Sequence, residues 1–295
     1  MEKSPFLASR RTLLCALPAM AMTQSLFASP EVTLNEQFAA IERGIGGRLG
    51  VSALDTGTGR RLGYRGSELF AMCSTFKFLL AACILKRIDD GKEDFKRRIS
   101  YSEKDLLEYA PVTRAHVQEG TMTVGDLCAA AVEQSDNTAA NLLLPWIGGP
   151  VGLTQFVRSL GDQVTRVDRK EPDLNSALPG DPRDTTSPAA MLGTMEKLLT
   201  DSVLFKASQT KLIEWLTKCT TGLARLRAGV PADWRAGDKT GTGERGAAGD
   251  IGIFWPAQRQ PILIAAYVIG GNTTAEERDS AFAAAGRTVA ELFQR

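Results

Sequence analysis

The chain has 295 residues, 43% of them hydrophobic, which is enough to bury a large core in one or two domains. Its formal net charge of +1 offers no basic field, so nucleic acid is not an expected partner. The single histidine, His116, argues against a histidine-ligated zinc centre and leaves a Ser-His-Asp triad without support. Neither a metal nor another cofactor is expected.

The beginning of the chain has the features of an export signal. Basic residues precede an apolar stretch over residues 13–22, which is too short to span a bilayer. Residues 9–14, with paired arginines, resemble a twin-arginine signal, which implies bacterial export. We therefore expect a signal peptide over residues 1–28, cleaved after Ala21 or Ala28, and a periplasmic or secreted protein without stable membrane association. The alternative is a retained membrane anchor.

A helix and a β-hairpin are expected next. Residues 38–41 end a helix that the glycines of residues 44–47 close. Residues 48–55 alternate in the manner of a strand, and residues 61–64 return after a Thr-Gly-Thr-Gly turn. This pattern predicts an antiparallel hairpin.

The middle of the chain, from Ser74 to about Trp215, reads mostly as helices with Gly and Pro at the joints. Its first helix contains the run 78–85, which is apolar all round and is therefore expected to be buried on every side. Thr123 starts a later helix with a capping-box-like sequence, and Ser187 starts another with proline at the first position.

Strand character returns near the C-terminus, at residues 234–241, 250–255 and 261–268, and a last helix begins near Thr274. Because strands come from both ends of the chain and helices from its middle, the sequence predicts an α+β fold. Its antiparallel sheet is built from both chain ends and flanked by helices, and a central all-helical lobe faces it across a cleft. We expect the α/β lobe at about 29–72 and 216–295 and the helical lobe at about 73–215.

The pair Ser74 and Lys77 could carry chemistry at the start of the buried helix. Three residues apart, they lie on one helix face. Burial disfavours the charged form of a lysine, and a lysine that loses its proton can serve as a base for a serine. The plain alternative is that Ser74 caps the helix and Lys77 extends to solvent, since S-x-x-K alone is a weak signal.

Further short stretches strengthen the signal. Ser135-Asp136-Asn137 follows a helix, Glu171-Pro172-Asp173-Leu174-Asn175 lies in a loop, and Lys239-Thr240-Gly241 lies on an expected edge strand. In this order and spacing, together with S-x-x-K, they resemble a class A serine β-lactamase. The resemblance covers nearly all of the mature chain. It implies that residues 29–295 form a monomeric catalytic domain that hydrolyses penicillins and cephalosporins through a serine acyl-enzyme and confers antibiotic resistance.

The resemblance also implies catalytic roles. Ser74 is the nucleophile, and its N–H forms the oxyanion hole with that of Thr242. Lys77 activates the serine; either Lys77, or Glu171 through a water, takes its proton. Ser135 passes a proton to the departing nitrogen, and the charge of Lys239 assists that transfer.

Deacylation separates a hydrolase from its alternatives. Glu171 is expected to act as general base on a water that Asn175 also holds. One alternative is a D-alanyl-D-alanine peptidase, which shares the acylating residues but has no reason to carry Glu171 together with Asn175. The other is a β-lactam sensor, which is acylated by the antibiotic and stays acylated. The resemblance implies a substrate site made of Asn137, Asn175, Thr240, Gly241, Thr242, Arg225 and Tyr109. Glu108 and Thr221 are expected to line the same cleft.

Arg225 is expected to bind the substrate carboxylate. Many relatives place an arginine on the strand after K-T-G, where this chain has Ala248. Other relatives place the positive charge at the position that Arg225 occupies in this chain. Arg278 is the second candidate for binding the substrate carboxylate. In relatives the Glu-Pro bond is typically cis, and an ion pair matching Arg169–Asp184 closes the loop.

Cysteine positions depart from the family pattern. Cys73 precedes the nucleophile, but the position of its usual disulfide partner holds Gly243. Cys128 matches half of another family disulfide whose second position is Ala81; Cys83 lies two residues along, roughly 200° round the helix. We therefore expect no family disulfide and a free, buried Cys73, which gives no support for carbapenem hydrolysis.

Overall fold

The computed structural model describes residues 1–2 and 30–294 of the chain. Nearly all of the proposed signal peptide therefore lies outside the described residues. Among the described helices, none is long and apolar enough to cross a membrane.

A five-stranded antiparallel sheet is the centre of the fold, in the order β2-β1-β9-β8-β7. Its strands are β1 (Arg48–Asp55), β2 (Arg61–Tyr64), β7 (Arg235–Thr242), β8 (Ala248–Trp255) and β9 (Ile262–Ile269). β1 pairs with β9, so that Val51 lies opposite Ala266, and the two chain ends share one sheet. The α+β fold, the hairpin and the edge position of the Lys-Thr-Gly strand are thus confirmed.

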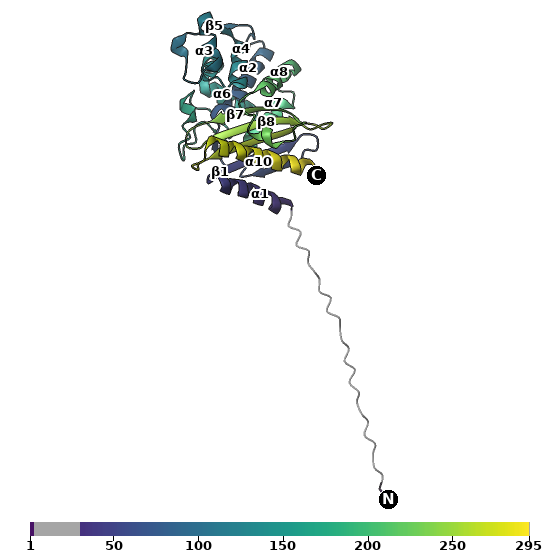
Figure 1. The fold of residues 1–295 in the computed structure, drawn as a ribbon. Coiled ribbons are helices and arrows are strands. Elements are labelled where there is room, and N and C mark those ends of the chain that lie inside the picture. The colour runs from purple at the N-terminus through teal and green to yellow at the C-terminus, as the bar shows by residue number, and fades with distance from the viewer. Residues whose placement is uncertain (3–29, 295) are drawn as a thin grey trace.

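Two terminal helices lie together below the sheet in Figure 1: α1 (Pro30–Ile45) and α10 (Ala275–Gln294). The core on this side contains Phe38 and Ile45 of α1. The prediction that the first helix ends near residue 41 was wrong. Because Ile45 also enters the core, the helix continues through the exposed Gly44, where the cost of a helical glycine is only about 1 kcal/mol.

The other face of the sheet meets helices from the middle of the chain. α7 (Pro188–Leu199) contacts β1 and β9, and α8 (Lys206–Lys218) contacts β7. The division into two lobes stays a prediction, and α7, counted with the helical lobe, packs directly on the sheet. The expected caps are present: Thr123 accepts the N–H of Asp126 at 3.0 Å, and Ser187 accepts that of Ala190 at 3.2 Å.

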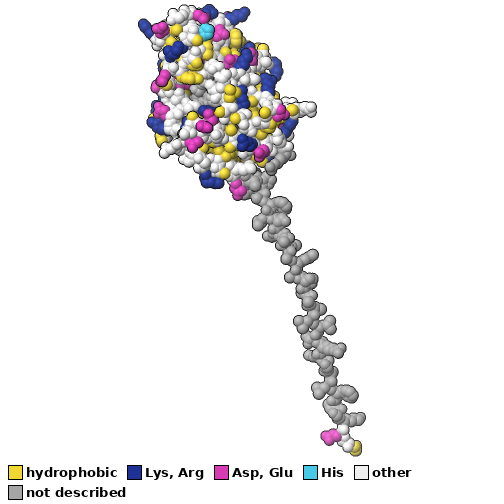
Figure 2. Space-filling view, in the orientation of Figure 1, with side chains coloured by type: hydrophobic (Ala, Val, Ile, Leu, Met, Phe, Trp, Pro, Cys, Tyr) yellow, Lys and Arg dark blue, Asp and Glu magenta, His cyan; other side chains and the backbone are white. Residues whose placement is uncertain are grey.

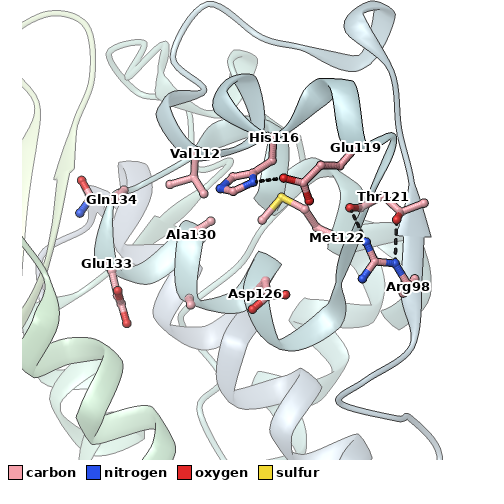
Figure 3. Close-up of a pocket in the computed structure, with 11 residues that line it drawn as sticks. Arg98, Val112, His116, Glu119, Thr121, Met122, Asp126, Ala130, Glu133 and Gln134 are labelled. Atoms are coloured by element: carbon pink, nitrogen blue, oxygen red, sulfur yellow. Dashed lines mark hydrogen bonds and ion pairs between the residues drawn. The ribbon is translucent and has the colours of Figure 1, made fainter.

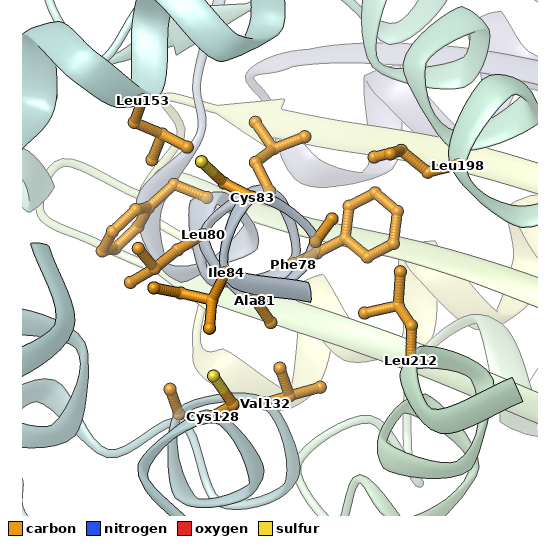
Figure 4. Packing of buried hydrophobic residues seen from close by; sticks show 14 of the residues in the cluster. Phe78, Leu80, Ala81, Cys83, Ile84, Cys128, Val132, Leu153, Leu198 and Leu212 are labelled. Carbon is orange, nitrogen blue, oxygen red and sulfur yellow. The ribbon is translucent and has the colours of Figure 1, made fainter. Parts of the chain in front are cut away.

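The first helix of the middle region, α2 (Phe76–Asp89), is enclosed as its apolar sequence predicts: residues 76–85 are all buried. Figure 4 shows its side chains meeting those of neighbouring helices on several sides. The remaining helices are α3 (Pro111–Ala115), α4 (Val124–Glu133), α5 (Asn137–Leu143), α6 (Gly149–Ser159) and α9 (Leu226–Gly229). Two small sheets pair β3 (Phe70–Ala71) with β6 (Thr185–Thr186) and β4 (Arg98–Ser100) with β5 (Thr121–Thr123).

Candidate active site

A cleft of about 350 Å³ lies where the edge strand β7 meets the start of α2. Its lining residues are Ser74, Tyr109, Ser135, Asn137, Asn175, Thr221, Arg225, Thr240, Gly241 and Thr242. Three ionisable residues that the sequence singled out, Lys77, Glu171 and Lys239, are buried rather than part of this lining. Glu108, expected in the cleft, is exposed and does not line it. Figure 2 shows acidic and basic side chains interspersed over the face in view.

Ser74 lies in a 3₁₀ turn, Cys73–Thr75, that leads into α2. Nζ of Lys77 donates to Oγ of Ser74 at 2.9 Å, as the spacing of three residues allows. The lysine also donates to the backbone oxygen of Ser135 at 2.8 Å and to Oδ1 of Asn137 at 2.5 Å. Burial lowers the pKa of Lys77, while the nearby Glu171 carboxylate opposes that effect.

The carboxylate of Glu171 is the meeting point of three donors. Its Oε1 accepts from Oγ of Ser74 at 3.1 Å and lies 3.0 Å from Nζ of Lys77. Its Oε2 accepts from Nδ2 of Asn175 at 2.5 Å. The side-chain oxygen of Asn175, Oδ1, is buried and has no hydrogen-bond partner among the described residues. The site thus joins a serine hydroxyl, a lysine and a carboxylate within hydrogen-bond distance.

The loop that carries Glu171 is held at several points. The Glu171-Pro172 peptide bond is cis, as the resemblance predicts. Nε of Arg169 donates to Oδ2 of Asp184 at 2.6 Å, which closes the loop as expected. Asn141, which the sequence analysis missed, accepts the N–H of Glu171 at 3.1 Å and donates to its carbonyl oxygen at 2.8 Å. Its signal was faint: one helical turn after Asn137, it lies on the same helix face.

The Ser-Asp-Asn stretch divides into structural and chemical parts. Asp136 caps α5 by accepting the N–H of Ala139 at 2.9 Å, and it accepts the N–H of Thr113 at 2.8 Å. The hydroxyl of Ser135 accepts from Nζ of Lys239 at 3.0 Å. Ser135 has a φ of +58° and Cys73, next to the nucleophile, a φ of +46°. Such backbone strain in non-glycine residues is typical of functional sites.

Lys239 projects from β7 and is fully buried. Besides Ser135, its ammonium donates to the backbone oxygen of Thr240 at 2.7 Å. Burial lowers the pKa of Lys239 to about 8. Close approach of β7 to Ser74 depends on Gly241, because a Cβ there would lie 2.9 Å from the backbone nitrogen of Ser74 and 2.7 Å from the carbonyl oxygen of Met72.

Arg225 lines the cleft, and its guanidinium group donates several hydrogen bonds to other residues of the protein. Nη1 donates to the carbonyl oxygens of Gly241 and Gly249, both at 2.9 Å, and Nη2 donates to Oγ1 of Thr242 at 2.8 Å. Nε donates to Oδ1 of Asp279 at 2.7 Å. The second candidate, Arg278, donates to Thr273 at 2.6 Å and does not line the cleft.

His116 lies outside this site. It belongs to a different hollow, beside α4, and its Nδ1 is 2.7 Å from Oε1 of Glu119 (Figure 3). A Ser-His-Asp triad at Ser74 is therefore excluded. No cluster of His, Cys, Asp and Glu suited to a metal ion occurs in the described part of the chain.

The four described cysteines are free and buried. A Cβ at Gly243 would lie 2.7 Å from Sγ of Cys73, so the two positions are adjacent, as the resemblance implies. Figure 4 shows Ala81 on the side of α2 that faces Cys128 and shows Cys83 on the opposite side. The helical offset inferred from the sequence explains why Cys83 does not replace the residue missing at Ala81.

Comparison with known proteins agrees with this geometry. A model of the β-lactamase enzyme family matches residues 33–293. β-Lactamase CTX-M-97 of Escherichia coli is 41% identical over 285 residues, which is 97% of each chain. β-Lactamase OXY-1 of Klebsiella oxytoca is 40% identical over 99% of each chain.

Solved structures give the same result. The class A β-lactamase reconstructed as the last common ancestor of Gram-negative bacteria is 57% identical, with a TM-score of 0.87 over 88% of this chain and 99% of that one. The putative class A β-lactamase PenP of Rhodopseudomonas palustris is 51% identical, with a TM-score of 0.86 over 88% and 99%. The chain therefore belongs to the class A serine β-lactamases.

Proposed function

We propose that this β-lactamase opens the ring amide of penicillins and cephalosporins by attack of Ser74 and then hydrolyses the resulting ester with the help of Glu171. The observation that carries the proposal is the shared contact of Ser74 and Lys77 with one carboxylate oxygen, at 3.1 and 3.0 Å. A nucleophile, a cation and a general base are thereby brought together without a histidine or a metal ligand.

In acylation, Oγ of Ser74 forms a bond to the lactam carbonyl carbon and loses its proton. Glu171 is the better acceptor of that proton, because the hydroxyl already donates to it while Lys77 is itself a donor to Ser74, Ser135 and Asn137. The oxyanion is stabilised by the N–H groups of Ser74 and Thr242. When the C–N bond breaks, Ser135 gives its proton to the nitrogen, and Lys239, 3.0 Å from the Ser135 oxygen, stabilises the charge left there. The proton held by Glu171 then passes to Ser135 through Lys77, whose Nζ lies 3.0 Å from Oε1 of Glu171 and 3.5 Å from Oγ of Ser135, so Glu171 is a carboxylate again before deacylation.

In deacylation, a water attacks the ester carbon and gives its proton to Glu171. The bond between that carbon and Oγ of Ser74 then breaks, and Glu171 returns the proton to Ser74, whose oxygen lies 3.1 Å from its carboxylate. We place this water between Glu171 and Asn175. The amide of Asn175 donates to the carboxylate with one end, and its buried carbonyl oxygen can accept a hydrogen bond from the water with the other. This arrangement would orient the water with two fixed acceptors, which supports hydrolysis over permanent acylation.

Substrate binding is assigned to the cleft walls. Arg225 and Lys239 supply positive charge for the substrate carboxylate, with Thr240, Gly241 and Thr242 beside them on β7. The remaining contacts are assigned to Asn137, for the side-chain amide of the substrate, and to Tyr109, which is half-exposed at the cleft wall.

We also propose that residues 1–28 are an export signal, that residues 29–295 form the catalytic domain, and that the mature protein is a periplasmic or secreted monomer. The start of the family match at residue 33 supports this division. The intact mass and the sedimentation behaviour of protein recovered from the periplasm test these statements.

The experiment that tests the function combines nitrocefin turnover with intact-protein mass spectrometry. Hydrolysis predicts rapid turnover with an adduct on Ser74 that disappears when substrate is consumed. A lasting adduct without turnover would instead indicate a β-lactam sensor. Release of D-alanine from a D-alanyl-D-alanine peptide would indicate a peptidase.

A further inference from the structure

Two hydroxyl groups form a close pair in the lining of the cleft. Oγ1 of Thr221 and Oγ1 of Thr240 are 2.5 Å apart, and both residues line the cleft with Arg225. At this distance one hydroxyl must donate to the other, so the pair as a whole has one hydrogen left. An anion in the cleft benefits only if that remaining hydrogen points toward it.

A buried thiol lies behind the pair. Sγ of Cys219 is 3.2 Å from Oγ1 of Thr221, and Cys219 is only 2% exposed. Burial raises the pKa of this thiol, with the nearby Lys239 opposing the effect, so the group keeps its hydrogen at neutral pH. A neutral thiol can donate its hydrogen to Thr221 or to the neighbouring buried carboxylate of Asp238, or it can accept one from Thr221.

The direction of the hydrogen bonds between Thr240, Thr221 and Cys219 decides whether a hydroxyl hydrogen is available to a ligand in the cleft. If Thr240 donates to Thr221 and Thr221 donates to the sulfur, both hydroxyl hydrogens point inward and none is left for a ligand. If the thiol donates to Thr221, the hydroxyl pair keeps one hydrogen for the cleft. An anion next to Thr240 therefore favours the second arrangement, in which Cys219 is the donor at the buried end.

We infer that Cys219 is a positioning residue for the substrate carboxylate, acting through Thr221 and Thr240. The inference rests on the proposed function, because the anion is the carboxylate of a β-lactam. Cys219 itself does not line the cleft. Its effect is to hold the two hydroxyl groups in the orientation that donates toward the ligand.

The test compares penicillin G with its methyl ester, which lacks the negative charge, in the wild type, Cys219→Ala and Cys219→Ser. Loss of one buried hydrogen bond should lower kcat/KM for the free acid by about threefold to tenfold, through KM, and leave that for the ester unchanged. Cys219→Ser keeps a donor and should restore the acid preference. Cys83→Ala, at another buried cysteine outside the cleft, is the matched control.

Thr221→Val removes the acceptor of the thiol and should abolish any further effect of Cys219→Ala on the acid-to-ester ratio. This comparison serves as the readout if Cys219→Ala alone lowers the yield of folded protein. Equal loss for acid and ester, no loss for either, or a Cys219→Ser variant as weak as Cys219→Ala would overturn the inference. A wild type that hydrolyses neither compound would instead refute the proposed function.

Discussion

Nζ of Lys77 lies 3.0 Å from Oε1 of Glu171, and neither side chain is exposed to solvent. Removing one partner of such a pair leaves an uncompensated buried charge, which is costly. The pair is nevertheless useful because both groups also contact Ser74, at 2.9 and 3.1 Å. The contact thus connects the charge balance of the buried site to the reactivity of the serine.

Replacement of Glu171 by Gln should trap the acyl-enzyme, because Lys77, 2.9 Å from Oγ of Ser74, can still take the serine proton in acylation while the deacylating water loses its base. The amide keeps the shape of the side chain but cannot accept a proton from water, so kcat should fall by about 10²–10⁴-fold. Intact mass should show the substrate covalently held on Ser74. Asp173→Asn, at an exposed acid in the same loop, should turn over normally. Unchanged turnover in Glu171→Gln would refute the role of Glu171.

The pH dependence of kcat/KM should report Lys239. Burial lowers its pKa to about 8, so the side chain is charged below that pH and neutral above it. Because the charge attracts the substrate carboxylate and supports Ser135, kcat/KM should decline as the pH rises through about 8. Lys239→Arg, which stays charged, should move this decline to higher pH. A decline at the same pH in both proteins would assign it to another group.

Arg225→Ala should weaken the binding of carboxylate-bearing substrates. Hydrogen bonds to a charged group contribute about 1.5–3 kcal/mol, which corresponds to roughly a 10- to 150-fold rise in KM. Arg278→Ala is the control, because that side chain does not line the cleft. A larger rise in KM for Arg278→Ala than for Arg225→Ala would reverse the assignment.

Gly243→Cys should form a disulfide with Cys73. A Cβ at Gly243 lies 2.7 Å from Sγ of Cys73, which is within the reach of such a bond. The same Cβ would lie 2.6 Å from the carbonyl oxygen of Asn175, so some shift of that loop is expected. Thiol titration of the denatured protein should show fewer free thiols than in the wild type, because the disulfide consumes both the new cysteine and Cys73. In a Cys73→Ser background the new thiol should remain free, and a free thiol with Cys73 present would contradict the expectation.

Arg169→Ala should destabilise the loop that carries Glu171. Asp184 is buried, and loss of its partner at 2.6 Å leaves its charge poorly compensated, at a cost of about 3 kcal/mol. Urea unfolding measures the change. Arg183→Ala, which removes an exposed arginine from its pair with the partly buried Asp181, should cost less than about 1 kcal/mol. Similar losses in the two variants would show that the Arg169 pair has no special part in stability.

Much of the fold could be inferred from local patterns. The run after Lys77 is apolar on every side and forms a helix buried on every side, and the alternating segments near both ends form strands of one sheet. The error at the end of α1 has a physical cause. Gly44 favours ending the helix, but the free energy gained by burying Ile45 in the core exceeds the cost of keeping a glycine in the helix.

The order and spacing of short motifs were sufficient to name Ser74, Lys77 and Glu171, because the set resembles that of the class A β-lactamases. Sequence alone could not choose between Arg225 and Arg278, find Asn141 behind Glu171, or connect Cys219 to the cleft. Those relationships join residues that are distant along the chain, such as Arg225 and Asp279. They exist only after the sheet and helices have packed, because packing and not local periodicity decides which distant side chains meet.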